Sequence, residues 1–344
     1  MSTTLTTRVL NESEYGAWNT VLEESAQGSV YAMPEYLEAL CEAAGGSYRV
    51  VAACRNDDLT GGVAIHEQTS ARGLRVSPRH LLYYNGLVLR DTPTKYPSQR
   101  TSRQLETTTA LALALQAACY DGVTLKSRSS FTDARGFLAQ GWTPRLGYSY
   151  VVPIGDLGAA WGRVEQNLRR LVNRCANEGM VVGEDDDFDS FFRLHAATTE
   201  RKGLPLYLPE PAFRRFFARL HAAGLCKLYH ARRSDGRSIA AQLVLLGRFP
   251  VSHSVCAATD PAFMAGGVTP FLRWRVFEAL SALGYAANDL TDAALNPVTH
   301  FKSQLGGDLA LCLVLEKQPP AAPLHRRMLR RLRDVVAGAS LPGA

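Results

Sequence analysis

The stretch from Leu243 to Leu305 is the part of the sequence from which the fold can be predicted most directly. It contains two apolar runs, Leu243-Val-Leu-Leu246 and Ser252-His-Ser-Val-Cys-Ala-Ala258, and then the segment Asp260-Pro-Ala-Phe-Met-Ala-Gly-Gly-Val-Thr269. Apolar residues then recur with a helical period from Pro270 to Leu283. This order predicts two strands, a glycine-bearing loop and a helix. Such a loop supplies backbone N–H groups at a helix N-terminus, where a phosphate or a developing oxyanion binds.

Polar residues gather where the next predicted strand, residues 286–290, comes to its end. Asp289 and Asp292 lie at this point, and binding groups collect at the carboxyl ends of strands in α/β sheets. Either carboxylate can accept a proton from an amine or orient it. The residues that follow complete the candidate set: Asn296 and His300 as substrate contacts, and Lys302.

Length and composition indicate a folded chain of two domains. The chain has 344 residues, 46% of them hydrophobic, and a mean hydropathy of −0.10. No apolar run reaches the roughly 18 residues of a membrane helix, and Met1–Arg8 does not resemble a secretory signal. The seven cysteines are scattered and odd in number, which is typical of buried thiols in a reducing compartment. We therefore predict a cytoplasmic protein.

The same numbers bear on metals and partners. His253 and Cys256 stand at a possible ligand spacing, but no second pair accompanies them, so we predict no metal site. The net charge of +6 and the pI of about 9.0 permit a polyanionic partner without requiring one.

Patterning over the rest of the chain predicts alternating helices and strands. The predicted helices cover 11–25, 34–44, 98–119, 131–139, 161–178, 188–201 and 210–223. The predicted strands cover 48–54, 60–67, 80–89, 122–126, 148–154, 180–183, 225–232, 238–246 and 308–316.

The two halves have the same order of elements, which indicates an internal duplication. Residues 34–154 and 210–316 both contain a helix, three strands, a long helix, a strand, a short helix and a strand. Phe137-Leu-Ala-Gln-Gly-Trp142 aligns with Phe301-Lys-Ser-Gln-Leu-Gly306. We predict an α/β (α+β) protein of two tandem domains, 5–147 and 148–318, each a mixed sheet flanked by helices. The second copy carries Lys302 where the first has Leu138, so we expect the second to be active and the first to be a platform or substrate-binding half.

An ordered series of motifs in the second half resembles a known family. The series comprises Leu168–Gly179, Thr199-Glu-Arg-Lys-Gly203, Asp235-Gly-Arg-Ser-Ile-Ala240, Asp260-Pro-Ala-Phe263, Asp289-Leu-Thr-Asp292 and Phe301-Lys302-x-x-Leu-Gly-Gly307. Together with the tandem arrangement, it resembles the GNAT-fold acyltransferases of the FemAB/FemX-like group, which have a BioF2-like acetyltransferase domain.

The resemblance implies an acyltransferase. Such proteins transfer an activated acyl group, from acyl-CoA or aminoacyl-tRNA, to an amine of a cell-envelope precursor or small molecule, with no permanently bound cofactor. Lys302 matches a family lysine associated with the charged donor. The remaining expected roles are catalysis for Asp289 and Asp292, donor binding for Gly266, Gly267, Val268 and Thr269, and substrate binding for Arg201 and Tyr207. The usual pyrophosphate loop of simple acetyltransferases is absent, which favours aminoacyl-tRNA over acyl-CoA.

Each assignment has a structural alternative. The segment 266–269 also reads as a helix start, with Thr269 as N-cap. Asp292 also suits a helix cap or an ion pair with Arg273 or Lys302. A catalytically silent binding protein that keeps the duplicated fold is the rival function.

The chain ends in a basic segment, and we treat 319–344 as a tail. Five arginines lie between residues 324 and 336, and Leu324, Met328, Leu332 and Val335 share one helical face. This helix is suited to contact tRNA, an anionic membrane surface or the protein itself. No DNA partner is expected.

Overall fold

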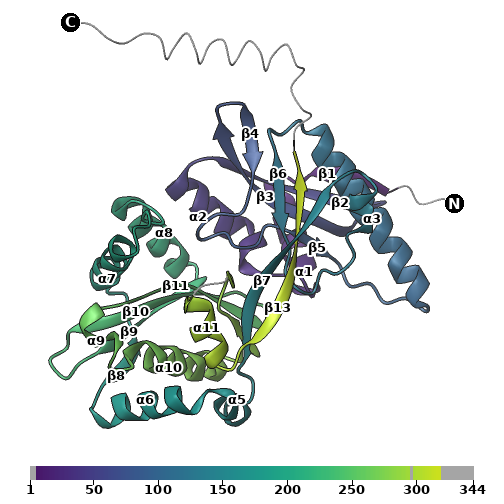
Figure 1. The fold of residues 1–344 in the computed structure, drawn as a ribbon. Coiled ribbons are helices and arrows are strands. Elements are labelled where there is room, and N and C mark those ends of the chain that lie inside the picture. The colour runs from purple at the N-terminus through teal and green to yellow at the C-terminus, as the bar shows by residue number, and fades with distance from the viewer. Residues whose placement is uncertain (1–4, 295–296, 319–344) are drawn as a thin grey trace, which may run out of the picture.

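A computed structural model of the chain describes residues 5–294 and 297–318. These residues form one sheet with helices on its faces, in two lobes (Figure 1). The strands are Leu5–Val9 (β1), Ser47–Arg55 (β2), Asp58–Ser70 (β3), Gly73–Val76 (β4), Leu87–Leu89 (β5), Val123–Lys126 (β6), Thr143–Pro153 (β7), Val181–Glu184 (β8), Cys226–Arg232 (β9), Ser238–Leu245 (β10), Val251–Thr259 (β11), Ala287–Asp289 (β12) and Asp308–Lys317 (β13).

The helices alternate with these strands. They are Tyr15–Glu23 (α1), Pro34–Ala44 (α2), Pro97–Ala117 (α3), Arg135–Leu138 (α4), Leu157–Arg163 (α5), Gln166–Asn177 (α6), Phe188–Arg201 (α7), Glu210–Ala222 (α8), Pro261–Met264 (α9), Val268–Ala282 (α10) and Pro297–Gln304 (α11). Within the described residues, no helix is long and apolar enough to cross a membrane.

The predicted duplication is confirmed at the level of elements. The first half contains α2, β2, β3, β4, α3, β6, α4 and β7, and the second contains α8, β9, β10, β11, α10, β12, α11 and β13. The two orders agree apart from β5 in the first half and α9 in the second, and the third strand of the first copy is β4, which was not predicted. Phe137 lies in α4 and Phe301 in α11, which are equivalent helices. The α/β fold of two tandem copies predicted from the sequence is therefore present.

The last strands of the two copies tie the halves together. The strand order is β1-β2-β3-β4-β6-β13-β7-β12-β11-β10-β9-β8, with β5 paired to β3. Thus β13 pairs with β6 of the first copy, β7 pairs with β12 of the second, and β7 and β13 pair with each other, all antiparallel. Figure 1 shows these two long strands running from one lobe to the other. The boundary expected between residues 147 and 148 falls inside β7.

A shared hydrophobic core also joins the halves. Trp18 and Tyr36 of the first half and Phe213 and Phe216 of the second belong to one buried cluster. The rings of Tyr36 and Phe216 meet edge to face, with centroids 5.7 Å apart. Because both halves contribute to this core, it fixes their relative position.

Two element predictions were wrong. The strand predicted for 80–89 exists only as β5, because the chain turns at Leu81, whose φ is +68°, and residues 81 and 82 are buried as a loop. The helix predicted for 161–178 is two helices, α5 and α6, which are separated at Val164, where ψ is 132°. In the first case, burial produced an apolar pattern over a loop. In the second case, the buried apolar face continues across the break between two helices.

Candidate functional site

The candidate site lies where β11 and β12 stop pairing. These parallel strands are in register over only three pairs, ending with His253 opposite Asp289. Strand β11 then continues to Thr259 without β12 beside it, whereas the chain leaves β12 as a turn. We call residues Asp289–Asp292 the β12 turn. The end of a parallel strand pair is a common position for ligand-binding groups in α/β sheets.

Asp289 anchors the β12 turn. The Tyr84 hydroxyl donates to its Oδ2 at 2.7 Å, and its Oδ1 accepts from the Ser149 hydroxyl and, at 2.8 Å, from the Thr291 amide. Burial alone would raise the pKa of Asp289, but these donors and His253, whose Nδ1 is 3.6 Å from Oδ2, bring the pKa well below its usual range. The carboxylate is therefore ionised, and both of its oxygens are already engaged.

The β12 turn has an unusual backbone that Lys302 holds in place. Thr291 and Asp292 have φ values of 49° and 54°, which are uncommon for residues with side chains. The Thr291 hydroxyl donates to the Ser254 carbonyl at 2.9 Å. The Lys302 ammonium, from α11, donates to the carbonyls of Thr291 and Asp292, the latter at 2.6 Å. The turn thus links two of the predicted catalytic residues, Asp289 and Lys302.

Lys302 has an environment suited to chemistry. Burial and the nearby charge of Arg273 lower the pKa of Lys302 to about 8. An ammonium has three N–H donors, and two of them bind the turn carbonyls. The third donor has no acceptor among the described residues.

Asp292 extends outward from the same turn. Its side chain is 61% exposed and its Oδ1 lies 4.0 Å from Lys126 Nζ of β6. Oδ1 also accepts from the Ala293 amide at 3.0 Å, which is a local cap. No ion pair between Asp292 and Arg273 or Lys302 occurs among the described residues, and Lys126 is the cation near it.

The glycine loop is more enclosed than the sequence suggested. The amides of Gly266 and Gly267 donate to the carbonyls of Phe263 and Met264, at 3.1 and 3.2 Å. Gly267 is the N-cap of α10 with φ +90°, and a Cβ there would come within 2.6 Å of Leu171 of α6. A helix start was thus a correct interpretation, although Thr269 lies inside α10 and is not its cap.

Val268 and Thr269 are the part of the expected donor-binding loop that lies in the first turn of α10, and Val268 is buried. The amides of a first helical turn have no intrahelical acceptor. The Thr269 hydroxyl lies 3.0 Å from that of Thr259. Arg174 of α6 donates to the Gly266 carbonyl at 2.5 Å. Helix α6 therefore packs against this loop, in contrast to the open phosphate loop that the sequence suggested.

Of the predicted substrate contacts, Tyr207 lies near Asp292 and Arg273, and Arg201 lies beside the glycine loop. Tyr207 is stacked on His80, with ring centroids 4.3 Å apart, and also contacts His195. Arg201 is exposed and donates to the Met264 sulfur at 3.1 Å. His300 is exposed on α11. Asn296 lies outside the described residues, as does the predicted basic tail.

Three residues of this region, Tyr84, Lys126 and Ser149, were not recognised from the sequence, and Arg273 was named only as an alternative ion-pair partner of Asp292. Tyr84 and Lys126 come from the first half, Ser149 from β7, and Arg273 from α10. Lys126 at the end of β6 was detectable as a polar residue at a strand end. Tyr84 was hidden in the segment wrongly predicted as a strand, and Ser149 carried no signal.

A large cavity lies elsewhere. Its volume is about 690 Å³, and it is lined in the first half by the β2–β3 hairpin, the segment after β5 and the start of α3. None of its lining residues belongs to the predicted site. The charged side chains that line it include arginines, two of which form ion pairs with glutamates.

Comparison with known proteins gives a consistent picture of the fold. Residues 162–303 match the model of the acetyltransferase (GNAT) domain family. The crystal structure of FemX superposes with a TM-score of 0.67 at 13% identity, covering 89% of this chain and 96% of FemX. No curated protein sequence matched the chain.

Two further structures share the architecture. L-PGS from Bacillus licheniformis gives a TM-score of 0.54 at 14% identity, covering 88% of this chain and 97% of that protein. A tandem GNAT protein from the clavulanic acid biosynthesis pathway gives 0.53 at 11% identity, covering 93% and 100%. At these identities the similarity is one of fold. The matched domain contains the β12 turn and Lys302.

Proposed function

Because the chain carries a GNAT acetyltransferase domain within a FemX-like tandem fold, we propose that it transfers an acyl or aminoacyl group from an activated donor to an amine. The donor is an aminoacyl-tRNA or an acyl-CoA, and the acceptor is an amine of a cell-envelope precursor or a small molecule. The observation that carries the proposal is Lys302, which has one uncommitted N–H donor at the β12 turn inside the matched domain.

In the proposed reaction, Lys302, Asp292 and Asp289 each have one role. The neutral amine attacks the donor carbonyl carbon, and the C–O or C–S bond to the leaving group breaks. The remaining N–H of Lys302 stabilises negative charge on the carbonyl oxygen or the leaving atom. Asp292, at the exposed edge, accepts the proton that the amine loses. Asp289 is a positioning residue, because its oxygens are already bound within the protein.

The surroundings of the α10 N-terminus support an aminoacyl-tRNA donor over acyl-CoA. The pyrophosphate of CoA requires several free amides at a helix start. Here the amides of Gly266 and Gly267 are bound by α9, and Leu171 packs against Gly267. A charged tRNA instead contributes an ester, and its phosphates are met by basic side chains on the protein surface.

We also propose a cytoplasmic location, because both donor types are made there. All seven cysteines are free thiols in the structure, which is compatible with a reducing compartment.

Donor binding tests this proposal. Acetyl-CoA and a pool of charged tRNA are titrated against the purified full chain at two salt concentrations. We expect saturable tRNA binding that weakens steeply with salt. Saturable acetyl-CoA binding alone would keep the acyltransferase and change the donor. Binding of neither would contradict the proposal and favour a silent binding protein.

A further inference from the structure

Arg273 is a partly buried cation, and two of its three guanidinium nitrogens have no partner in the described part of the protein. It lies on α10, and its Nε and Nη1 atoms are buried with no hydrogen-bond acceptor among the described residues. Burial lowers the pKa of its guanidinium to about 10, but the group stays charged at neutral pH. An unpaired buried charge costs several kcal/mol, and buried arginines are normally paired.

The surroundings of Arg273 belong to the candidate site. Its charge lowers the pKa of Lys302 and acts on Cys256 of β11 and on Tyr207. Cys256 lies in the part of β11 that continues beyond β12. Arg273 is therefore close to the place where the two strands separate.

The charges around this place do not balance. Lys302 is influenced by Arg273 and Lys126, both positive, and by Asp289 and Asp292, both negative. Lys302 itself is a third cation, and Lys202 acts with Arg273 on Cys256. Cys256 and Tyr207 are neutral at pH 7, because burial raises the pKa of each to about 12. Positive charge therefore exceeds negative charge around Arg273, which suits an anionic ligand.

We propose that Arg273 binds a carboxylate carried by the substrate, next to the β12 turn. A guanidinium presents N–H donors in a fork that matches a carboxylate in two hydrogen bonds. The inference rests on the proposed function, because it names the substrate class of the same site. The carboxylate belongs either to the acyl group or to the acceptor amine.

Matched probes distinguish these two sources. For a carboxylate on the acyl group, the pair is succinamic acid, which carries the carboxylate, and succinamide, which carries a carboxamide in its place. For a carboxylate on the acceptor amine, the pair is β-alanine and its carboxamide counterpart, β-alaninamide. Thermal unfolding of the full chain is followed as each probe is titrated. We expect the carboxylate member of one pair to raise the unfolding midpoint by a few degrees. The concentration that it needs should be at least about tenfold lower than the concentration at which its amide gives the same rise. The responding pair identifies the source.

Variants assign the effect to Arg273. Arg273→Gln should abolish the preference for the carboxylate. Arg275→Gln is the matched control, because Arg275 lies on the same helix but pairs with Glu278 at 2.8 Å. Without any probe, Arg273→Met should raise the unfolding midpoint, because it removes two buried donor atoms that have no acceptor among the described residues. A structural arginine would give the opposite sign.

The outcomes that overturn the proposal are distinct from those that overturn the transferase. Equal responses to acid and amide in both pairs would exclude the carboxylate subsite, and so would a lower midpoint for Arg273→Met without probe. Acyl transfer that persists under those results would leave the proposed function intact. A clear carboxylate preference without transfer from any donor would leave the subsite standing and contradict the transferase.

Discussion

At the scale of single residues, the site contains groups that hold the β12 turn and two groups, Lys302 and Asp292, to which we assign chemistry. Asp289 accepts from Tyr84, Ser149 and the Thr291 amide, so its oxygens are committed to structure. Lys302 binds two carbonyls and keeps one donor. The β12 turn connects them, so displacement of Asp289 would also displace the carbonyls that hold Lys302.

Asp289→Asn should therefore lower the free energy of unfolding by about 2–4 kcal/mol, because an amide nitrogen would face the donors that the carboxylate accepts from. Urea unfolding measures this. Asp308→Asn is the control: Asp308 is exposed, and its ion pair with Arg163 is worth under about 1 kcal/mol. Equal losses in the two variants would contradict the anchoring role.

The Asp289 variant should also change the dependence of stability on pH. The pKa of Asp289 is lowered in the folded protein, so its ionised form stabilises the fold above the ordinary carboxyl pKa of about 4. That stabilisation is lost as the pH falls through the folded pKa. The wild type should therefore lose more stability than Asp289→Asn between about pH 5 and pH 2. If the stability of the two proteins fell equally between about pH 5 and pH 2, the lowered pKa of Asp289 would be contradicted.

Lys302 predicts an alkaline limit on activity. The pKa of Lys302 is lowered to about 8, so the charged donor disappears as the pH rises through that value. We expect kcat/KM to fall tenfold per pH unit above about pH 8. Lys302→Arg should remove this limb in any activity that it retains, because a guanidinium stays protonated. If kcat/KM of Lys302→Arg still fell above about pH 8, the fall would have to come from another group.

Which site residues could be recognised from the sequence depended on how far apart they lie along the chain. Asp289 and Asp292 were recognised because they lie at the end of one predicted strand, and Lys302 was recognised because it matches the family's Phe-Lys pair. Tyr84 and Ser149 contact Asp289 from positions 205 and 140 residues away, and no local pattern indicates such contacts. The enclosed glycine loop was missed for the same reason, since Leu171 reaches it from α6.

At the scale of elements, β13 matters most because it completes the sheet of the other half. It pairs with β6 through Val314–Lys317, and Leu315 is fully buried in the core of the first half beside Phe137 and Trp142. The duplicated order of elements was predictable from periodicity. The exchange of last strands was not, because each strand has the same alternation whichever partner it pairs with.

Leu315→Ala should destabilise the protein by about 2–4 kcal/mol, because it leaves a cavity in the core of the first half. Leu311→Ala, on the same strand but 46% exposed, should change stability by less than about 0.5 kcal/mol. Unfolding can be followed by the fluorescence of the tryptophans, including Trp142 in this core. Similar effects in the two variants would contradict the strand exchange.

At the scale of the whole molecule, neither half is complete alone. The first half lacks β13 for its sheet, and part of the shared core comes from α7 and α8. The site is likewise composite, because Tyr84 and Lys126 belong to the first half, whereas Lys302 and Asp292 belong to the second. Both halves must therefore be in place for the chemistry.

A fragment of residues 1–154 should accordingly fail to fold cooperatively, although it contains a whole copy of the duplicated order. Its denaturation curve is expected to be broad, and its amides should exchange rapidly with solvent. The intact chain measured alongside is the control. A sharp transition in the fragment would show that the exchanged strand is dispensable.

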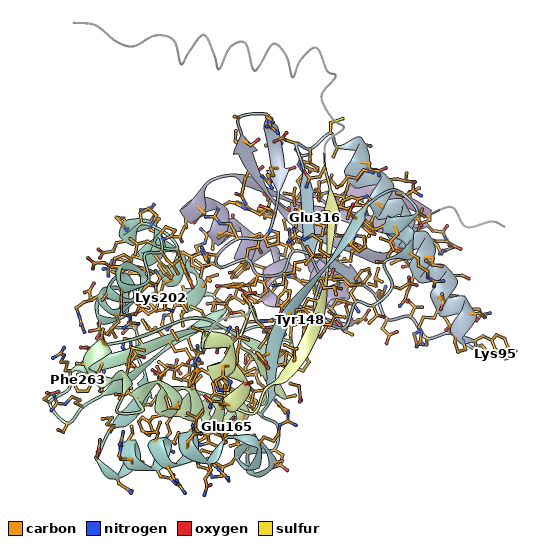
Figure 2. All side chains as sticks on the ribbon, viewed as in Figure 1. Lys95, Tyr148, Glu165, Lys202, Phe263 and Glu316 are labelled. Carbon is orange, nitrogen blue, oxygen red and sulfur yellow. The ribbon has the colours of Figure 1, made fainter. Side chains whose placement is uncertain are left out.

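The most direct test of acyl transfer is a single-turnover measurement with labelled donors. Charged tRNA and acetyl-CoA, each labelled in the acyl group, are mixed with excess protein and a panel of amines, and labelled amides are separated. We expect transfer from one donor, reduced at least about a hundredfold in Lys302→Met, the scale of losing one oxyanion donor, and unchanged in Lys95→Met, a distant exposed lysine labelled in Figure 2. No labelled amide from either donor, or equal rates in Lys302→Met and wild type, would contradict the account.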